Sequence, residues 1–74
     1  MIHNLKILPT YFEDVTIGKK TFEIRKNNRD FQIGDSLVLH EWKGNHYTGR
    51  TIVKTVCYVT DFKQRSKYVV LGIE

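Results

Sequence analysis

A glutamate and an arginine two positions apart are the residues of this sequence best placed to do chemistry together. Glu23 and Arg25 lie in residues 21–25, where polar and apolar side chains alternate. Residues two apart on a β-strand point to the same side of a sheet, so these two side chains form an acid–base pair on one face. On an enclosed face such a pair serves a ligand site, whereas on an open face it is a structural ion pair. The pattern leaves both interpretations open.

The whole net charge of the chain, formally +4, lies beside this pair. Residues 19–29 contain five basic residues and one acidic residue, while the rest of the chain has seven of each. The five are Lys19, Lys20, Arg25, Lys26 and Arg29. A local positive field attracts polyanions, nucleic-acid phosphates first. The alternative interpretation is a solvated basic loop without a ligand.

No other side chains have the spacing of a metal or nucleophile site. His3, His40 and His46 include no pair four apart on a helix, and Cys57 is the single cysteine. Because His40 and Cys57 both alternate with apolar residues, we interpret the first as a half-buried packing histidine and the second as a core thiol. The chain also lacks a GxSxG elbow and a glycine-rich phosphate loop. We therefore expect no metal, no cofactor and no disulfide.

Exposed aromatic residues matter if the ligand is a nucleic acid, because bases stack on aromatic rings. Tyr47 lies between two glycines in a polar segment, so we expect it to be exposed. Tyr68 flanks the last apolar segment, from which it would reach the mouth of a curved sheet.

These side chains must be positioned by a chain that is mainly β. Alternation and turn residues predict strands at 3–8, 21–25, 36–42, 50–60 and 67–73, the fourth long enough to contain a bulge. A short helix is expected from Tyr11 to Ile17, because Thr10 and Glu13 match a capping box and Gly18 is suited to end it.

The alternation also predicts which side chains of residues 21–25 face the core. Phe22 and Ile24 are expected to point inward, which sends Glu23 and Arg25 to the opposite face. Strict alternation would put Lys20 on the core side. Because Lys20 follows a helix exit at Gly18, the alternation need not yet apply, and its position stays open.

At 74 residues the chain is expected to form one domain, residues 1–74, with a small core. Long strands around one short helix favour a highly curved sheet or small barrel capped by the helix. No apolar run approaches the roughly 20 residues that cross a bilayer, and the first residues lack a signal-peptide core. We therefore expect a cytoplasmic protein without membrane contact.

Residues 18–25, Gly-Lys-Lys-Thr-Phe-Glu-Ile-Arg, resemble the GxKxxExR signature of the ASCH domain superfamily. Three further features follow in the order that this family shows: Leu5-Lys6-Ile7 before a short helix, Phe-Gln-Ile-Gly-Asp at 31–35, and Tyr-Val-Val-Leu-Gly-Ile at 68–73. The sequence looks most similar to the small single-domain bacterial and phage branch, whose function is unknown.

The resemblance implies a PUA-like fold, an α+β curved β-barrel with one or two short helices. It also implies a cleft between helix and barrel, lined by Lys20, Glu23 and Arg25, that binds RNA or a modified nucleotide. This assignment places Lys20 in the site. Lys19, Lys26 and Arg29 would then attract phosphates, and Glu23 would accept a hydrogen bond from a base amino group.

Two other functions remain as alternatives. Some ASCH relatives are amidohydrolases that deacylate a modified cytidine, and here Lys20 with Glu23 as general base would carry such chemistry. Their nucleophilic threonine falls on the position of Glu23, so we rank an enzyme after a binding module. A phage or bacterial protein-interaction module is the third alternative, and it predicts an exposed apolar patch.

Overall fold

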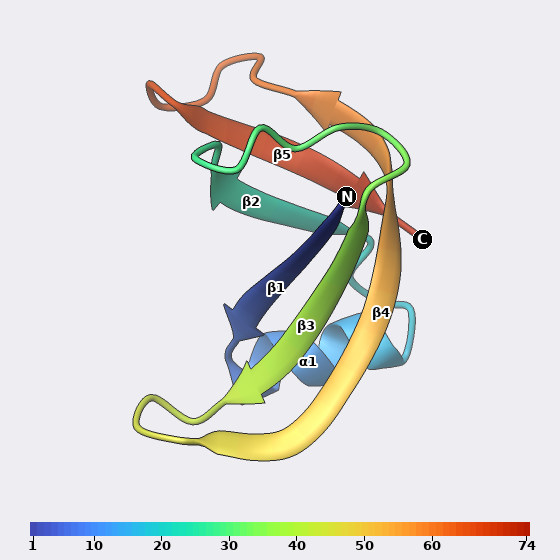
Figure 1. The fold of residues 1–74 in the computed structure, drawn as a ribbon, viewed down its shortest axis with the longest axis vertical. Helices are drawn as coiled ribbons and strands as arrows, with labels where there is room; N and C mark the ends of the chain where they lie inside the picture. Colours follow the sequence, from blue (N-terminus) through green and yellow to red (C-terminus); the bar gives the residue numbers. More distant parts are fainter.

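The computed structural model describes residues 1–74 as a bent, five-stranded mixed sheet with one short helix (Figure 1). The elements are β1 (Ile2–Ile7), α1 (Pro9–Thr16), β2 (Phe22–Lys26), β3 (Ser36–Trp42), β4 (Tyr47–Thr60) and β5 (Tyr68–Ile73). The strand order is β1-β3-β4-β5-β2, in which β1 runs parallel to β3 and all other neighbours are antiparallel. The prediction of a mainly β chain with a short helix is confirmed.

The 14-residue strand β4 makes the sheet bend. Its first part pairs with β3 and its last part with β5, so one strand belongs to both halves (Figure 1). The register passes from Val56↔Ile73 to Tyr58↔Gly72, which leaves Cys57 as the extra residue of a β-bulge. The predicted bulge is therefore present.

The bend brings the two edge strands, β1 and β2, toward each other without joining them into one ladder. The sheet is consequently not closed into a barrel. We call the opening between β1 and β2 the seam. It carries the candidate site described below.

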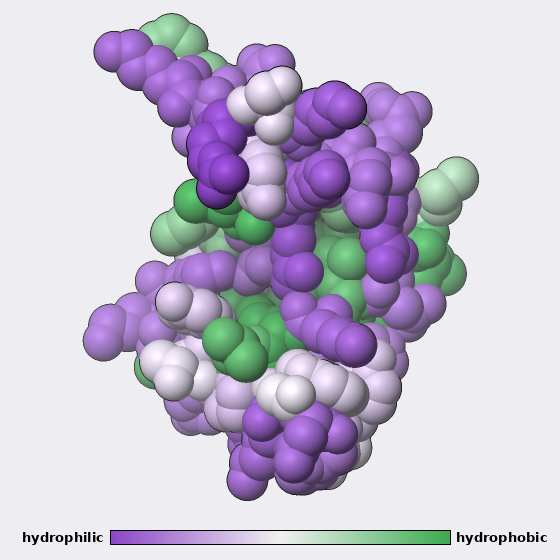
Figure 2. Space-filling view, turned by 90° about the vertical axis from the view of Figure 1, so that its left-hand side faces the viewer, coloured by the Kyte–Doolittle hydropathy of each residue, from purple (hydrophilic) through white to green (hydrophobic).

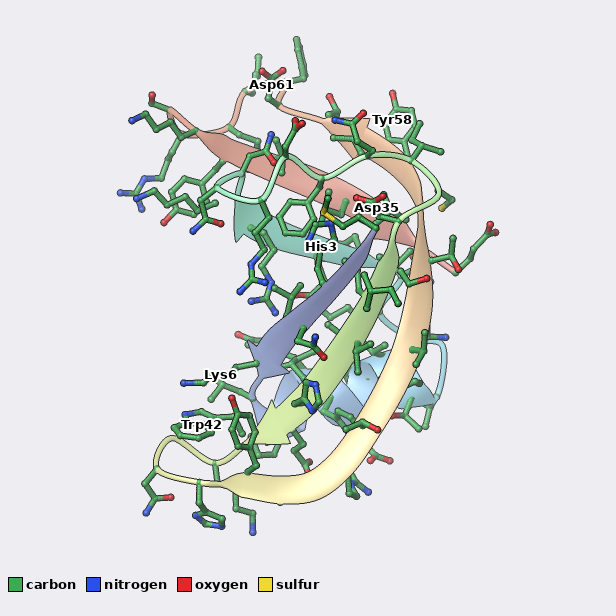
Figure 3. The ribbon with its side chains drawn as sticks, in the orientation of Figure 1. His3, Lys6, Asp35, Trp42, Tyr58 and Asp61 are labelled. Carbon is green, nitrogen blue, oxygen red and sulfur yellow. The ribbon has the colours of Figure 1, made fainter.

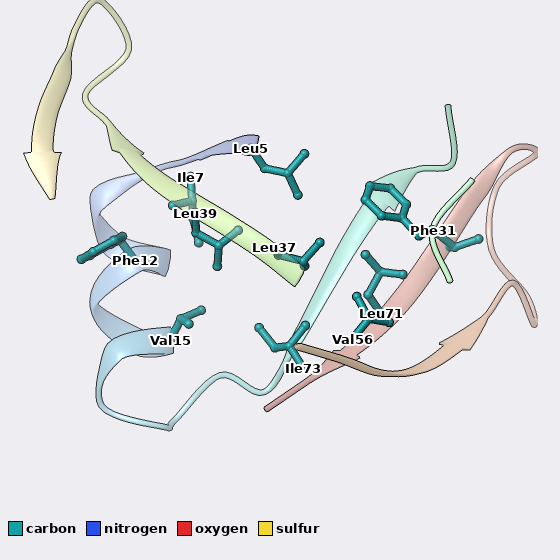
Figure 4. Packing of buried hydrophobic residues seen from close by; sticks show 11 residues of the cluster. Leu5, Ile7, Phe12, Val15, Phe31, Leu37, Leu39, Val56, Leu71 and Ile73 are labelled. Atoms are coloured by element: carbon teal, nitrogen blue, oxygen red, sulfur yellow. The ribbon is translucent and has the colours of Figure 1, made fainter. Parts of the chain in front are cut away.

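The core lies between the two halves of the sheet and α1 (Figure 4). Helix α1 contributes Phe12 and Val15, three positions apart on one face. The remaining nine buried apolar residues are Leu5, Ile7, Phe31, Leu37, Leu39, Val56, Val69, Leu71 and Ile73.

Helix α1 begins earlier than expected and without a capping box. Leu8 is the N-cap residue and makes no side-chain cap, and Thr10 lies inside the helix. The predicted capping box is therefore wrong, because Pro9 occupies the first helical turn, where its missing N–H needs no partner. The predicted end is confirmed, since Gly18 follows the helix with φ +77° and its N–H donates to the carbonyl of Val15.

The side chains of β2 face opposite to the prediction. Glu23 is 5% exposed, whereas Phe22 and Ile24 are 45% and 51% exposed. The cause is pairing with β5, in which Glu23 lies opposite the fully buried Leu71 and so shares its inward side. The inner surface of β2 therefore presents charged groups to the seam.

Cys57 is exposed, so its interpretation as a core thiol is wrong. The bulge shifts the alternation of β4 by one residue: Ile52 and Val56 face the core before it, and Val59 faces the core after it. Cys57 falls at the shift itself, where it points away from the core.

Helix α1 spans eight residues, and no helix of the structure is long and apolar enough to cross a membrane.

Candidate functional site

A cavity of about 490 Å³ opens at the seam beside the start of α1. Its lining combines apolar side chains with four charged groups that come from the two edge strands and the loop before β2. The lining residues are Lys6, Ile7, Leu8, Tyr11, Lys20, Phe22, Glu23, Ile24 and Arg25. We call this the first cavity.

The carboxylate of Glu23 is held by two cations in the first cavity. Its Oε1 accepts a hydrogen bond from Nζ of Lys20 at 2.5 Å, and its Oε2 accepts one from Nε of Arg25 at 3.0 Å. The Glu23 side chain is 6% exposed, so the two cations compensate the charge that folding removes from water. Lys20, Glu23 and Arg25 therefore lie together.

Lys20 reaches Glu23 because the chain turns sharply after α1. Backbone N–H groups of Lys19 and Lys20 both donate to the carbonyl of Asp14, which curls residues 18–20 back against the helix end. The Nζ of Lys20 also donates to the carbonyl of Phe22 at 2.7 Å. This turn lies outside the strand, so its side chains do not follow strand alternation.

The guanidinium of Arg25 also spans the seam. Its Nη2 donates to the backbone carbonyl of Lys6 on β1 at 2.8 Å, while its Nε holds Glu23 on β2. One side chain thus connects both edges of the sheet where no strand ladder does.

A second cavity of about 720 Å³ continues along the seam from the first. It is lined by Asn4, Leu5, Lys6, Arg25, Arg29, His40 and Tyr47. Lys6 and Arg25 line both cavities, so the two meet at these cations. Figure 2 shows this face of the molecule as a hollow with apolar residues inside and hydrophilic residues around it. We call the two cavities together the seam groove.

An aromatic cluster borders the second cavity. The Nζ of Lys6 lies 4.1 Å from the ring centroid of Trp42, and the rings of Trp42 and Tyr47 are 4.8 Å apart at 68°. His40 packs against Tyr47 at 5.8 Å, and its Nε2 lies 2.9 Å from Oδ1 of Asn4. Lys6 and Trp42 extend to the same side of the sheet in Figure 3. The predicted exposure of Tyr47 and half-burial of His40 are confirmed.

Sequence reasoning did not include Lys6 in the site. Lys6 alternates with Leu5 and Ile7 on the first strand, so the sequence predicts that its side chain points away from the core. Its position at the seam depends on the parallel pairing of β1 with β3, in which Lys6 lies opposite His40. No local pattern indicates a pairing between strands so far apart in the chain.

The structure places three predicted residues outside the seam groove. Lys19 and Lys26 are exposed and line neither cavity. Tyr68 is half-buried opposite Lys26 in the β2–β5 pair, with the guanidinium carbon of Arg65 5.2 Å from its ring centroid. Arg29 does line the second cavity.

A second buried carboxylate, Glu41, ties the β3–β4 hairpin to the helix. Its Oε1 accepts from the hydroxyl of Thr48 at 2.6 Å, and its two oxygens accept from Nε and Nη2 of Arg50 at 3.1 and 3.2 Å. These contacts, the Thr48 hydrogen bond first, lower the pKa of Glu41, and the Glu41 hydrogen bonds raise the pKa of Arg50. The guanidinium of Arg50 lies 4.7 Å from the ring centroid of Phe12 and also contacts Glu13.

A third buried carboxylate, Asp35, lies directly before β3 and beside His3 (Figure 3). Its oxygens contact Nε2 of His3 at 2.8 Å, the amino group of Met1 at 3.0 Å and the backbone N–H of Gln32 at 3.0 Å. The hydrogen bond from His3, followed by those from the other two donors, lowers the pKa of Asp35 to about 2. His3 therefore has a structural partner that sequence spacing alone did not reveal.

No group of three or more histidine, cysteine, aspartate or glutamate side chains lies close enough together to hold a metal ion. Hydrogen bonds and ion pairs instead satisfy these carboxylates: Glu23 contacts lysine and arginine, Glu41 contacts arginine, and Asp35 contacts His3 and the amino group of Met1.

Comparison with known proteins gives two matches. Residues 2–73 match the model of a family described as a domain of unknown function, DUF3850. A relative from Escherichia phage P2, named "Uncharacterized 12.9 kDa protein in GpA 3′region", is 43% identical over 60 residues. The aligned residues are 81% of this chain and 55% of the relative, so the chain spans about half the length of that phage protein.

Proposed function

The chain belongs to the DUF3850 family, whose function is unknown. We propose that it is a nucleic-acid-binding module of the ASCH, PUA-like type, with RNA or a modified nucleotide as its ligand. One observation carries this proposal. Two cavities meet at Lys6 and Arg25 and together form a continuous groove that also contains Lys20 and Arg29.

The charges of the seam groove suit a phosphate backbone. Four cations line it, and Glu23 is the one carboxylate among them. Because Glu23 is bound to Lys20 and Arg25, it fixes these two side chains in place before a ligand arrives. Preorganised cations lose less entropy on binding than flexible ones do, which favours affinity.

The first cavity suits a base. It has apolar walls from Leu8, Tyr11 and Phe22 around the Glu23 carboxylate. Each carboxylate oxygen has two lone pairs, so both oxygens keep acceptor capacity beyond the bonds from Lys20 and Arg25. A base amino group such as cytosine N4 is the donor that carboxylates recognise in nucleic acids.

The fold supports the assignment to a PUA-like barrel. The sheet bends through β4 until its edges face one another, and α1 packs against β3 within the core. In this interpretation the seam is the place where a curved barrel stays open to admit a ligand.

Titration of a single-stranded oligoribonucleotide at several salt concentrations tests the proposal. If the groove neutralises about three phosphates, the logarithm of the affinity falls with the logarithm of the salt concentration with a slope of about −2. Arg29→Gln is expected to weaken binding to all sequences and to make that slope shallower by about 0.7.

The matched control is Lys63→Gln, because Lys63 is exposed and lines neither cavity of the groove. This variant should bind as the parent does. Absence of binding at low salt, or equal losses in both variants, would contradict a binding site in the seam groove.

A second candidate function rests on the contact between Lys20 and Glu23. An ammonium 2.5 Å from a buried carboxylate, inside a cavity with apolar walls, is a pair that can exchange a proton with a bound substrate. The matching reaction is hydrolysis of an acylated cytidine. Water attacks the acyl carbon while Glu23 takes its proton, and Lys20 protonates the departing amine.

Incubation with N4-acetylcytidine tests this candidate. If it is correct, the nucleoside is deacylated, Lys20→Ala abolishes turnover, and Lys19→Ala leaves turnover unchanged, because Lys19 is exposed and lines neither cavity. Lack of turnover across a panel of acylated nucleosides would leave the binding module as the function of the site.

A further inference from the structure

We infer that the second cavity is a stacking site for the nucleotide next to the one held in the first cavity, with Tyr47 as the ring on which its base lies. This inference rests on the proposed function and extends it from one nucleotide to two consecutive, unpaired nucleotides. It follows from the ring cluster, from the position of the cations and from the continuity of the two cavities.

The ring of Tyr47 is exposed and yet held in place. Tyr47 is 55% exposed at the first position of β4. Trp42 packs on it at 4.8 Å and His40 at 5.8 Å, both at 68° to its plane. An exposed ring that packs against two aromatic neighbours offers a flat apolar surface with little entropy left to lose, which suits a stacked base.

The cations lie where the phosphates of such a ligand would be. The Nζ of Lys6 is 5.9 Å from the ring centroid of Tyr47, and Arg25 and Arg29 line the same cavity. Lys6 and Arg25 also line the first cavity. The phosphate that links the two nucleotides therefore belongs at Lys6 and Arg25, and the next phosphate along the strand at Arg29.

The aromatic cluster is not accounted for by the hydrophobic core. Neither Trp42 nor Tyr47 belongs to the buried apolar cluster, and the Lys6 ammonium lies over the Trp42 ring instead of another apolar residue. The other strongly exposed tyrosine of β4, Tyr58, has no cation within reach of its ring and lines neither cavity of the groove. Of the two tyrosines on β4, Tyr47 is therefore the one whose exposed ring lies beside both a cation and a cavity.

Two hexanucleotide RNA probes with equal charge separate the inference from the proposed function. One has a single cytosine in an otherwise abasic strand, and the other has two adjacent cytosines. We expect the second cytosine to increase affinity by about 5- to 150-fold, the range of one base–aromatic stack. Tyr47→Ala should remove this increase, whereas Tyr47→Phe, which keeps the ring, and Tyr58→Ala should retain it.

The fluorescence of Trp42 gives an independent measurement on the unmodified protein, because Trp42 is the single tryptophan and packs against Tyr47. The two-cytosine probe should change its emission more than the one-cytosine probe. Equal affinities and equal emission changes for the two probes would overturn the stacking site while leaving the proposed function intact. Binding of neither probe would overturn both.

Discussion

At the scale of single residues, the chain buries three carboxylates, and each of them has different hydrogen-bond partners. Glu23 has two side-chain cations at the seam, Glu41 has Arg50 and a hydroxyl, and Asp35 has His3 and backbone donors. Only Glu23 also lines a cavity of the seam groove. That difference separates a carboxylate available to a ligand from two that hold the structure together.

Asp35 predicts how stability depends on pH. Its pKa in the folded chain is about 2, below the ordinary value of 3.8, so the folded chain binds fewer protons than the unfolded chain between these values. The stability that Asp35 contributes is therefore fully present above about pH 4 and is lost as the pH falls toward about 2. Urea unfolding of the parent and of Asp35→Asn across this range measures the effect.

We expect Asp35→Asn to be less stable than the parent at about pH 5 and to lose less stability on acidification, because the titrating group is gone. Asp61→Asn is the matched control, since Asp61 is exposed and its side chain makes no hydrogen bond or ion pair. If Asp35→Asn lost stability on acidification as steeply as the parent, the lowered pKa would not be the source of the acid sensitivity.

At the scale of elements, the turn after α1 delivers Lys20 to Glu23, and Gly18 makes that turn possible. Gly18 has φ +77°, and no atom lies within 4 Å of the place where a Cβ would be. A side chain there meets no clash with neighbours, so a substitution has to contend only with the left-handed backbone conformation. That conformation is unfavourable by about 1–2 kcal/mol for an ordinary L-residue.

Gly18→Ala is accordingly expected to lower the free energy of unfolding by about 1–2 kcal/mol. Gly18→Asn should lower it by less, because asparagine tolerates this conformation and occurs at helix ends of this kind. Denaturant unfolding of both variants gives the comparison. Equal losses for alanine and asparagine would show that the backbone conformation at residue 18 is not what limits the turn.

Two elements show how far the sequence predicts this site. The charged segment and the Glu23–Arg25 pair are visible in the sequence, because strand alternation puts them on one face whichever way that face points. The sequence does not indicate whether that face points toward the core or away from it. The register of β2 with β5 decides this, because a shift of one residue would put Phe22 in the inward position of Glu23. Local alternation contains no information on that register.

Strand β4 shows the same limit. The sequence predicts a long strand with a bulge, but the strand begins at Tyr47 instead of residue 50. The residue at which the bulge falls decides whether Cys57 or its neighbours face the core. The bulge lies where β4 exchanges β3 for β5 as its partner, so tertiary pairing places it. Lys6 escaped prediction for a related reason, since its neighbours in the groove come from β2, β3 and β4.

At the scale of the whole molecule, the seam groove follows from topology. The first two strands of the chain do not pair with each other: β1 joins β3, β2 joins β5, and both become edges. Bending through β4 then turns the two edges toward one opening. Residues 19–29, which contain the net charge of the chain, lie beside this opening. Three of their five cations line the groove: Lys20, Arg25 and Arg29.

The bond from Arg25 to the Lys6 carbonyl has a consequence beyond any ligand. An unpaired strand edge is a template on which a strand of another molecule can add, and long uncovered edges lead to aggregation. Here the two edge strands, β1 and β2, face each other across the seam. The guanidinium of Arg25 also occupies the carbonyl of Lys6, an acceptor that an added strand would need. The same arginine that lines the groove thus occupies one acceptor on the β1 edge through which a strand of another molecule could add.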